Sequence, residues 1–422
     1  MLIYFIYTLL SPIFWLFLHI AKLFNPKIAE HLLDQKQSVE NVLIKIQNES
    51  NGRSIILFHG ASAGEFEQIK PLLQRIDHSK YFCIQSFTSP TIYSKEKDNP
   101  LADAVCYFPF DLPWSVNHFY KILKPQYMVI TRHDLWPHMI RLTQSNNIKL
   151  FFINANIHEN SLWVKPWVIS LSQYLFSHFE YITTGSERLL SNLKSITKDE
   201  KILVIGDTRF DSIIDRKDQN KDSLKLSDSE NNTILFGSLD DIDLQIVSDS
   251  IQIHYPNGNS SLLDKTHQLI IVPHEVNEET LMAFENTFSS INISSIRYSD
   301  YGSNQEFSCM IVDKVGMLAD LYAHADLAYV GAGFGRGVHS VIEPAVYSCA
   351  IAYGPNIHNL DEAVSMAKLG LSTIVNNANE LANFYPLLDQ PDLLKSIQEK
   401  TEQFVTRHKL CSQSLLNIIF SK

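Results

Sequence analysis

The sequence predicts an α/β protein of two doubly wound domains, each with a parallel sheet covered by helices on both faces. Three observations predict this class. The chain has 422 residues, more than one ordinary hydrophobic core accommodates, with 45% hydrophobic and 19% charged side chains. Short apolar runs alternate with polar segments of helix length in both halves of the chain. A polar stretch separates the two series of runs.

Seven apolar runs predict the strands of an N-terminal domain over residues 23–210. Runs of this length that alternate with helices are typical of parallel strands buried on both faces. Because the runs are separated by segments long enough for a helix, each pair of strands can be joined by a crossover. The runs are 54–60, 81–87, 104–110, 127–133, 149–155, 181–186 and 202–207.

Residues 211–232 are polar, charged and poor in core residues, so we predict an interdomain linker with at most one helical turn. Alternation resumes in a predicted C-terminal domain over residues 233–422, whose last helix is a candidate to pack back on the first domain. Two such domains would face a cleft, where open α/β sheets bind ligands. The runs of the second domain are 233–238, 269–275, 310–315, 327–333 and 349–355.

The N-terminal segment 1–22 predicts a membrane-anchor helix. No charged side chain occurs from Met1 to Ala21, and the run is long enough to cross a bilayer core of about 30 Å. Lys22 and Lys27 follow at once, which favours a cytoplasmic position for the rest of the chain. Pro12 interrupts a clean spanning helix. The anchor could span the bilayer or lie in it. The alternative is a first helix buried in the protein.

Charge and cysteine content exclude several classes of partner. The formal net charge is −11 and no long basic run occurs, so we expect no nucleic acid. The five cysteines are scattered and odd in number, which supports neither a disulfide framework nor a zinc site. The sixteen histidines show no metal-ligand spacing, and we predict no metal.

The segment 54–73 predicts a strand, a glycine-bearing turn at Gly60 and Gly64, and a helix that begins near Glu65. A helix N-terminus favours the ionised form of a carboxylate. Such a carboxylate can act as a general base that accepts the proton of an attacking hydroxyl. The alternative is that Glu65 only caps the helix.

Two further charged residues follow predicted strands, where such sheets place functional groups. Asp134 could orient a partner or stabilise charge, or it could cap the helix that Pro137 opens. Arg209 could neutralise an anion that develops on a departing phosphate or acidic sugar. Its alternative role is a surface salt bridge with Asp207 or Asp211.

The segment 327–355 predicts a nucleotide site. Its four glycines follow a strand and lead into a probable helix, and glycines let the backbone approach a phosphate near free N–H donors. Glu343 is placed to bind a ribose diol. The alternative is a purely structural glycine loop. The glycines are Gly331, Gly333, Gly335 and Gly337, the early helix residues are His339, Ser340 and Glu343, and Gly354 and Pro355 end the segment.

Seven motifs occur in a fixed order along nearly the whole chain. They are HGASAGE (59–65), DLWP (134–137), INANIHENS (153–161), IGDTRFD (205–211), VGMLADLY (315–322), GFGRGVHSVIEPA (333–345) and YGPNIHNLDEA (353–363). As an ordered set they resemble the Kdo transferases, which attach 3-deoxy-D-manno-octulosonic acid (Kdo) from CMP-Kdo to lipid A precursors.

The resemblance implies a two-Rossmann (GT-B) enzyme that is metal-independent and transfers Kdo with inversion at the anomeric carbon. Glu65 matches the general base, and Asp134 and Arg209 match positions thought to stabilise the transition state. His274 stands where an arginine is common, and Arg336 is a candidate for the missing cation. Ser340 replaces a usual asparagine and Asn156 a usual arginine. The CMP-binding positions are Pro273, His274, Gly316, Met317, Leu318, Ser340, Val341, Ile342 and Glu343.

We therefore predict an inverting Kdo transferase of lipopolysaccharide core biosynthesis. Its partners would be CMP-Kdo, a lipid A precursor and the bacterial inner membrane, with the catalytic domains on the cytoplasmic side and no cofactor. One alternative is another GT-B enzyme that uses a UDP-sugar, such as a lipid-disaccharide synthase or an epimerase. The other is an inactive membrane-bound nucleotide-sugar-binding protein.

Overall fold

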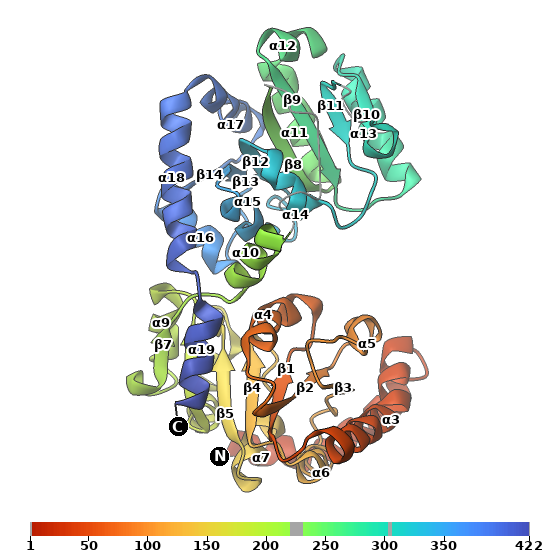
Figure 1. Ribbon diagram of the computed structural model, residues 1–422, viewed down its shortest axis with the longest axis vertical. Helices are drawn as coiled ribbons and strands as arrows, with labels where there is room; N and C mark the ends of the chain where they lie inside the picture. The colour runs from red at the N-terminus through yellow and green to blue at the C-terminus, as the bar shows by residue number, and fades with distance from the viewer. Residues whose placement is uncertain (1, 220–230, 303–305, 422) are drawn as a thin grey trace. The chain divides into compact units, whose positions relative to one another are not determined.

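The computed structural model describes residues 2–219, 231–302 and 306–421, and the chain divides into two compact units (Figure 1). Unit 1 comprises Met1–Ser212 and Leu410–Lys422, and unit 2 comprises Ile213–Lys409. Each unit holds a seven-stranded parallel sheet with helices on its faces. The predicted class of two parallel α/β domains is confirmed.

The strand order in unit 1 is β3-β2-β1-β4-β5-β6-β7, and all seven strands coincide with predicted apolar runs. The order reverses between β1 and β4, and open α/β sheets bind ligands beyond the carboxyl ends of the strands at such a reversal. The strands are β1 (Ser54–His59), β2 (Tyr81–Phe87), β3 (Ala104–Tyr107), β4 (Tyr127–Thr131), β5 (Lys149–Ile153), β6 (Phe179–Thr184) and β7 (Ile202–Val204).

Helices cover both faces of this sheet and form two hydrophobic clusters with it. They are α1 (Leu2–Leu9), α2 (Ser11–Ala21), α3 (Pro26–Glu49), α4 (Ala63–Arg75), α5 (Pro90–Glu96), α6 (Pro113–Leu123), α7 (Pro137–Ser145), α8 (Ile169–Phe176), α9 (Glu187–Leu193) and α19 (Cys411–Phe420), with short 3₁₀ turns at Leu162–Val164 and Asp199–Lys201.

The strand order in unit 2 is β10-β11-β9-β8-β12-β13-β14, with the reversal between β8 and β12. The sequence analysis missed β10 and β14, which are three-residue edge strands. The strands are β8 (Asn232–Leu239), β9 (His267–Pro273), β10 (Ser295–Arg297), β11 (Cys309–Ile311), β12 (Leu327–Val330), β13 (Ala350–Tyr353) and β14 (Ser372–Ile374).

The helices of unit 2 pack around one main hydrophobic cluster that includes side chains of both its central and edge elements. They are α11 (Asp241–His254), α12 (Asn259–Asp264), α13 (Glu278–Ser290), α14 (Leu318–Leu321), α15 (Ile342–Val346), α16 (Asp361–Lys368), α17 (Ala378–Ala382) and α18 (Pro391–Arg407), with 3₁₀ turns at Tyr298–Asp300, Tyr322–His324 and Tyr385–Asp389.

The final helix, α19, belongs to unit 1, where it packs against α4 (Figure 1). Leu415 and Leu416 lie in the same hydrophobic cluster as residues of β1 and α4. The buried carboxylate of Asp211 fixes the start of α19: it accepts hydrogen bonds from the backbone N–H groups of Leu410 and Ser412, both at 2.7 Å, and from the Ser412 hydroxyl at 2.6 Å. Asp211 is therefore not a surface partner of Arg209.

Part of the predicted linker is helical. Residues 211–219 lie in α10 (Arg209–Gln219), which is longer than the single turn that we expected, and residues 220–230 lie outside the described residues. Buried Phe210 and Asp211 attach the start of α10 to unit 1. Further along the helix, Arg216 pairs with Asp320 at 3.2 Å within unit 2. The charged composition that suggested a linker therefore belongs to a helix with specific ion pairs.

The predicted single anchor helix is instead a pair of helices. In the described part of the chain, no one helix is long and apolar enough to cross a membrane, whereas α1 and α2 meet the length and composition test only as a pair bent by 46°. Pro12 explains the break at Leu10, because proline lacks an N–H and its ring clashes with the preceding turn. The alternative of a buried first helix is also wrong, since α1 has no buried residue.

Candidate active site

Glu65 occupies the first turn of α4, directly beyond the carboxyl end of β1. Its Oε2 atom accepts hydrogen bonds from the backbone N–H of Ser62 at 3.0 Å and from the Ser62 hydroxyl at 3.2 Å. The side chain is only 5% exposed. Glu65 thus makes the contact of a helix cap, but it is much more buried than a cap requires. No other hydrogen bond reaches it from the residues that the structure describes, which leaves Oε1 able to accept a proton.

The electrostatic surroundings of Glu65 make it a stronger base than a solvated glutamate. Burial raises the pKa of its carboxyl, and the negative charge of Asp134 acts in the same direction. His59 and Ser62 oppose these effects without cancelling them. A carboxylate whose pKa is raised accepts a proton more readily, which suits a general base.

Asp134 is held by three donors from three different segments of unit 1. Its Oδ2 atom bonds to His59 Nε2 at 2.8 Å and to the Thr88 hydroxyl at 3.1 Å, and its Oδ1 atom accepts from Trp136 Nε1 at 2.6 Å. Burial alone would raise the pKa of Asp134, but His59, Trp136 and Thr88 together lower it. The ionised carboxylate therefore orients His59, the last residue of β1, beside Glu65.

Asp134 does not cap α7, which corrects one of its two expected roles. Asp111 makes that contact instead: its two carboxylate oxygens accept from the backbone N–H groups of His138 at 3.0 Å and Met139 at 2.7 Å. The sequence analysis missed Asp111, because it precedes its partner His138 by 27 residues.

Arg209 forms a close ion pair with Asp207 at 2.8 Å, and both side chains are largely buried. Its Nε atom also bonds to both oxygens of Asp207, at 3.2 and 3.1 Å. Burial alone would raise the pKa of Asp207, but Arg209 and Arg132 lower it. The expected salt bridge with Asp207 therefore exists, but it is an oriented pair at the carboxyl edge of the sheet rather than a loose surface contact.

A buried polar network connects this ion pair to the helix that carries Glu65. Gln68 of α4 donates to Asp207 at 2.9 Å and accepts from the Thr131 hydroxyl at 2.8 Å. Asn154 donates to the Thr131 hydroxyl at 3.3 Å and to the Thr208 hydroxyl at 2.9 Å. Gln68 lies one helical turn after Glu65, so the network fixes α4 against the ends of β4 and β5. These positioning residues were not predicted, although Asn154 and Thr208 lie within two of the quoted motifs.

The structure places the three predicted catalytic residues at one edge of one sheet. Glu65 and Asp134 flank the reversal between β1 and β4 and affect each other's charge. Arg209 follows β7, three strands beyond β4, and is connected to α4 through Asp207 and Gln68. Asn156 and His133 lie near one another at this edge, with 3.5 Å between Asn156 Nδ2 and His133 Nε2.

The predicted donor residues lie at or beyond the carboxyl ends of β9, β11 and β12 in unit 2. His274 follows Pro273 at the end of β9, and its ring stacks on that of His339 with 4.7 Å between centroids and 16° between planes. The Ser238 hydroxyl lies 2.9 Å from His274 Nδ1. Burial and the neighbouring His274 lower the pKa of His339. Two adjacent imidazoles thus lie where the resemblance leads one to expect an arginine.

The predicted helix after the glycine segment begins later than expected. His339 and Ser340 precede α15, and Glu343 lies in its first turn. Val341 and Ile342 are fully buried, so their side chains belong to the core and only their backbone can contact a ligand. The loop that contains Gly316, Met317 and Leu318 leads into α14, and Arg216 donates to the Gly316 carbonyl at 3.3 Å.

The glycine segment is held by a buried carboxylate that the sequence analysis did not single out. Asp243, in the first turn of α11, accepts from the Ala332 backbone N–H at 2.6 Å and from the Tyr329 hydroxyl at 2.8 Å. At Gly333, an added Cβ would lie 2.5 Å from the backbone nitrogen of Gly354. The two loops after β12 and β13 therefore touch, and only glycine fits at their contact.

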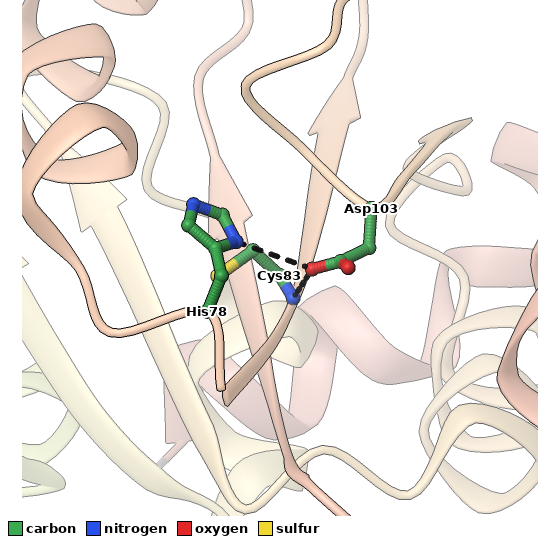
Figure 2. A group of neighbouring side chains, drawn as sticks. All are labelled: His78, Cys83 and Asp103. Carbon is green, nitrogen blue, oxygen red and sulfur yellow. Dashed lines mark hydrogen bonds and ion pairs between the residues drawn. The ribbon is translucent and has the colours of Figure 1, made fainter. Parts of the chain in front are cut away.

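One group of possible metal ligands occurs among the described residues, and it lies away from both sites: His78, Cys83 and Asp103 (Figure 2). The Asp103 carboxylate is already paired with Arg53 at 2.9 Å and accepts the Cys83 backbone N–H at 2.7 Å. Burial raises the pKa of the Cys83 thiol, which disfavours the thiolate that binds metals. A guanidinium and a neutral thiol do not suit a cation, so we interpret the group as a structural ion pair.

Comparison with known proteins agrees with this arrangement. Residues 34–212 match the family model of 3-deoxy-D-manno-octulosonic-acid transferases (kdotransferases). A 3-deoxy-D-manno-octulosonic acid transferase of Chlamydia muridarum is 26% identical over 84% of this chain and 81% of its own length. One of Rickettsia bellii is 24% identical over 99% of this chain and 98% of its own length. The UDP-GlcNAc 2-epimerase of Neisseria meningitidis bound to UDP-GlcNAc shares the fold, with a TM-score of 0.62 at 13% identity over 87% of this chain and all of its own.

The two parallel-sheet domains and these matches define a glycosyltransferase of the GT-B class. Within that class, the chain is similar to the 3-deoxy-D-manno-octulosonic-acid transferases, whose family model matches residues 34–212 and whose members are 24–26% identical over most of its length.

Proposed function

We propose that this protein transfers Kdo from CMP-Kdo to a lipid A precursor, with inversion, at the cytoplasmic face of a bacterial inner membrane. The observation that carries the proposal is the buried Glu65 carboxylate, whose pKa is raised by burial and which lies at the sheet reversal within the segment that matches the family model. The identity of the sugar in this proposal comes from the names of the similar proteins, and the choice of general base comes from the position and burial of Glu65.

In the proposed reaction, Glu65 removes the proton of an acceptor hydroxyl while its oxygen attacks the anomeric carbon of Kdo. The new C–O bond forms as the bond to the CMP phosphate breaks, and CMP leaves with the electron pair. Asp134 acts as a positioning residue through His59, since its oxygens are engaged by His59, Thr88 and Trp136. Arg209, fixed by Asp207, supplies positive charge at the same edge of the sheet.

The donor part of the proposal assigns CMP to the loops after β9, β11 and β12. The imidazoles of His274 and His339 and the exposed guanidinium of Arg336 are the candidate partners of the phosphate. Glu343 is the candidate partner of the ribose diol. No step of the proposed reaction uses a metal, so we expect EDTA to leave the rate of transfer unchanged.

Nucleotide protection tests the donor assignment. We expect CMP to raise the unfolding temperature of the full chain, because a ligand at 100 times its Kd stabilises the native state by about 2.7 kcal/mol, and we expect UDP to have no such effect. Protection by UDP and not CMP would instead support an enzyme that uses a UDP-sugar. Protection by neither nucleotide would indicate a lost donor site.

The pH dependence of kcat tests the electrostatics of the base. Glu65 works only when ionised, and its raised pKa means that activity is lost as pH falls through a value above the roughly 4.3 of a solvated glutamate. Because Ser62 favours the ionised form, Ser62→Ala should move this acidic limb to still higher pH. Glu67→Gln, on the same helix, should leave it unmoved. A wild-type limb near 4.3 that Ser62→Ala does not shift contradicts the assignment.

A further inference from the structure

The inward face of α1 and α2 carries polar side chains beside the buried Leu18. Tyr4, Tyr7 and Ser11 recur at the three- and four-residue spacing of one helical face. The Tyr4 hydroxyl lies 3.1 Å from His138 Nδ1 and the Ser11 hydroxyl 3.3 Å from His138 Nε2, while Tyr7 donates to Asp111 Oδ2 at 3.0 Å. His138 and Asp111 are buried. These contacts dock the helix pair onto unit 1 through hydrogen bonds.

The opposite face of the pair is apolar and exposed. Leu9, Ile13 and Phe17 are 66%, 64% and 60% exposed, and no charged side chain occurs from Leu2 to Ala21. A surface helix of a protein surrounded by water shows the reverse arrangement, with its apolar face inward. Large contiguous apolar patches mark interaction sites. Other exposed members of the patch are Leu2, Phe5, Ile6, Leu10, Leu16, Ile20, Leu23 and Phe24.

The environment that fits this face is the hydrocarbon of a bilayer, with anionic headgroups at its edge. Lys22 and Lys27, both exposed, follow the apolar face directly, and basic residues there attract anionic lipids. Trp15, also exposed, is a residue type that favours the membrane–water interface.

The docking contacts are incompatible with a perpendicular span. At about 1.5 Å per residue, α1 and α2 are about 12 and 16 Å long, and each is shorter than the roughly 30 Å of a bilayer core. The two helices pass the length and composition test for a span only together, with a bend of 46° between them. A perpendicular span would withdraw Tyr4 and Tyr7 from their partners into hydrocarbon and leave buried Asp111 without the Tyr7 hydroxyl, which is costly.

The docked helices connect directly to the loop that carries Asp134. His138 lies in the first turn of α7, which that loop precedes, and Asp111 holds the same turn through the N–H groups of His138 and Met139. From the next helix along the chain, α3, His31 lies 2.9 Å from the Thr88 carbonyl, and the Thr88 hydroxyl donates to Asp134. The exposed apolar face therefore belongs to a rigid extension of the candidate active site.

We propose that α1 and α2 lie in the plane of one leaflet, with their apolar face in the hydrocarbon and their polar face fixed on the Asp134 loop. The pair is then an in-plane platform that presents the catalytic edge of unit 1 to a substrate held in that same leaflet. This inference rests on the membrane association within the proposed function, but it does not depend on which sugar is transferred.

Sidedness of labelling tests the proposal. The five native cysteines are buried, so labelling of one added, exposed cysteine can be measured against a low background. One variant carries it in a short extension before Met1, and a control carries it as Lys36→Cys on the exposed face of α3. With the full chain in sealed vesicles, an impermeant maleimide should label both positions from the same side. Labelling of the extension only from the opposite side overturns the proposal.

Vesicle binding tests the apolar face itself. Sedimentation with vesicles of phosphatidylglycerol and phosphatidylcholine should show binding of the wild type, weakened about a hundredfold or more by the combined changes Leu9→Ser, Ile13→Ser and Phe17→Ser. Leu263→Ser with Met282→Ser, exposed in unit 2, is the matched control and should bind as the wild type does. Denaturant unfolding like that of the wild type shows that each variant is folded, and this control does not depend on the donor assignment. Unweakened binding of the triple variant, or a stable dimer that covers the face and excludes vesicles, contradicts the proposal.

Discussion

Glu65→Gln is expected to lower kcat for glycosyl transfer by about 10³-fold, the middle of the range that a general base contributes. Glutamine keeps the size of the side chain and an oxygen that accepts from the Ser62 backbone N–H, so the start of α4 should be preserved. What it cannot do is take up the proton of the acceptor hydroxyl. Steady-state kinetics with saturating donor measures the effect.

The matched control for Glu65→Gln is Glu67→Gln. Glu67 lies on the same helix, where its carboxylate contacts Lys70 and Ser212 instead of the site. We expect this control to retain kcat within a few-fold, and both variants to keep CMP protection. Equal activity of Glu65→Gln and wild type would remove Glu65 from the mechanism, while loss of CMP protection in Glu65→Gln would indicate a folding defect.

Gly333→Ala is expected to destabilise unit 2 by about 1–3 kcal/mol, the usual cost of overpacking, and to abolish CMP protection. The added Cβ would lie 2.5 Å from the backbone nitrogen and 2.7 Å from the Cα of Gly354, and backbone atoms cannot turn away as a side chain can. The two loops must therefore separate at the position assigned to the nucleotide. Denaturant unfolding and nucleotide protection measure the two effects.

Gly335→Ala provides the comparison within the same glycine segment. Its added Cβ would meet Asp240 Oδ2 at 3.4 Å, and the Ala332 carbonyl oxygen and Ile242 Cδ1 at 3.9 Å, which are ordinary contacts. We expect it to unfold like the wild type and to bind CMP. If both alanine variants bind CMP equally well, the contact between the two loops does not shape the donor site.

Much of the fold could be predicted because parallel strands buried on both faces leave continuous apolar runs in the sequence. Twelve such runs correspond to the strands β1–β9 and β11–β13. The strands Ser295–Arg297 and Ser372–Ile374 were missed since three-residue edge strands with mixed side chains carry no such pattern. The length of the helix over 211–219 was not predicted, because its polar composition is that of a loop; in the structure, Arg216 of this helix pairs with Asp320.

The positions of Glu65, Asp134 and Arg209 at one edge of the sheet could be predicted, because each residue follows a strand. The candidate site was not predictable where a buried side chain acts on a distant segment. Asp243 contacts the backbone of Ala332 at a separation of 89 residues, and Gln68 reaches Asp207 at 139. Propensity and motif spacing are local, whereas these hydrogen bonds are set by the packing of the sheet.

Prediction from the sequence was limited in the same way for the N-terminal segment. Composition predicts that residues 2–21 contact a membrane, but it cannot distinguish a span from an in-plane pair. The difference depends on Tyr4, Tyr7 and Ser11, which look like tolerated polar residues in an apolar run until their partners His138 and Asp111 are known.

The measurement that tests the central claim most directly is transfer itself, read by the mass of the lipid product. Membranes that carry the wild-type chain would receive a tetraacylated lipid A precursor and CMP-Kdo generated in situ, beside the Glu65→Gln variant. Our account predicts a Kdo-bearing lipid from the wild type and essentially none from the variant. A wild type that binds CMP yet forms no such lipid, or a variant that forms it equally fast, would contradict the account.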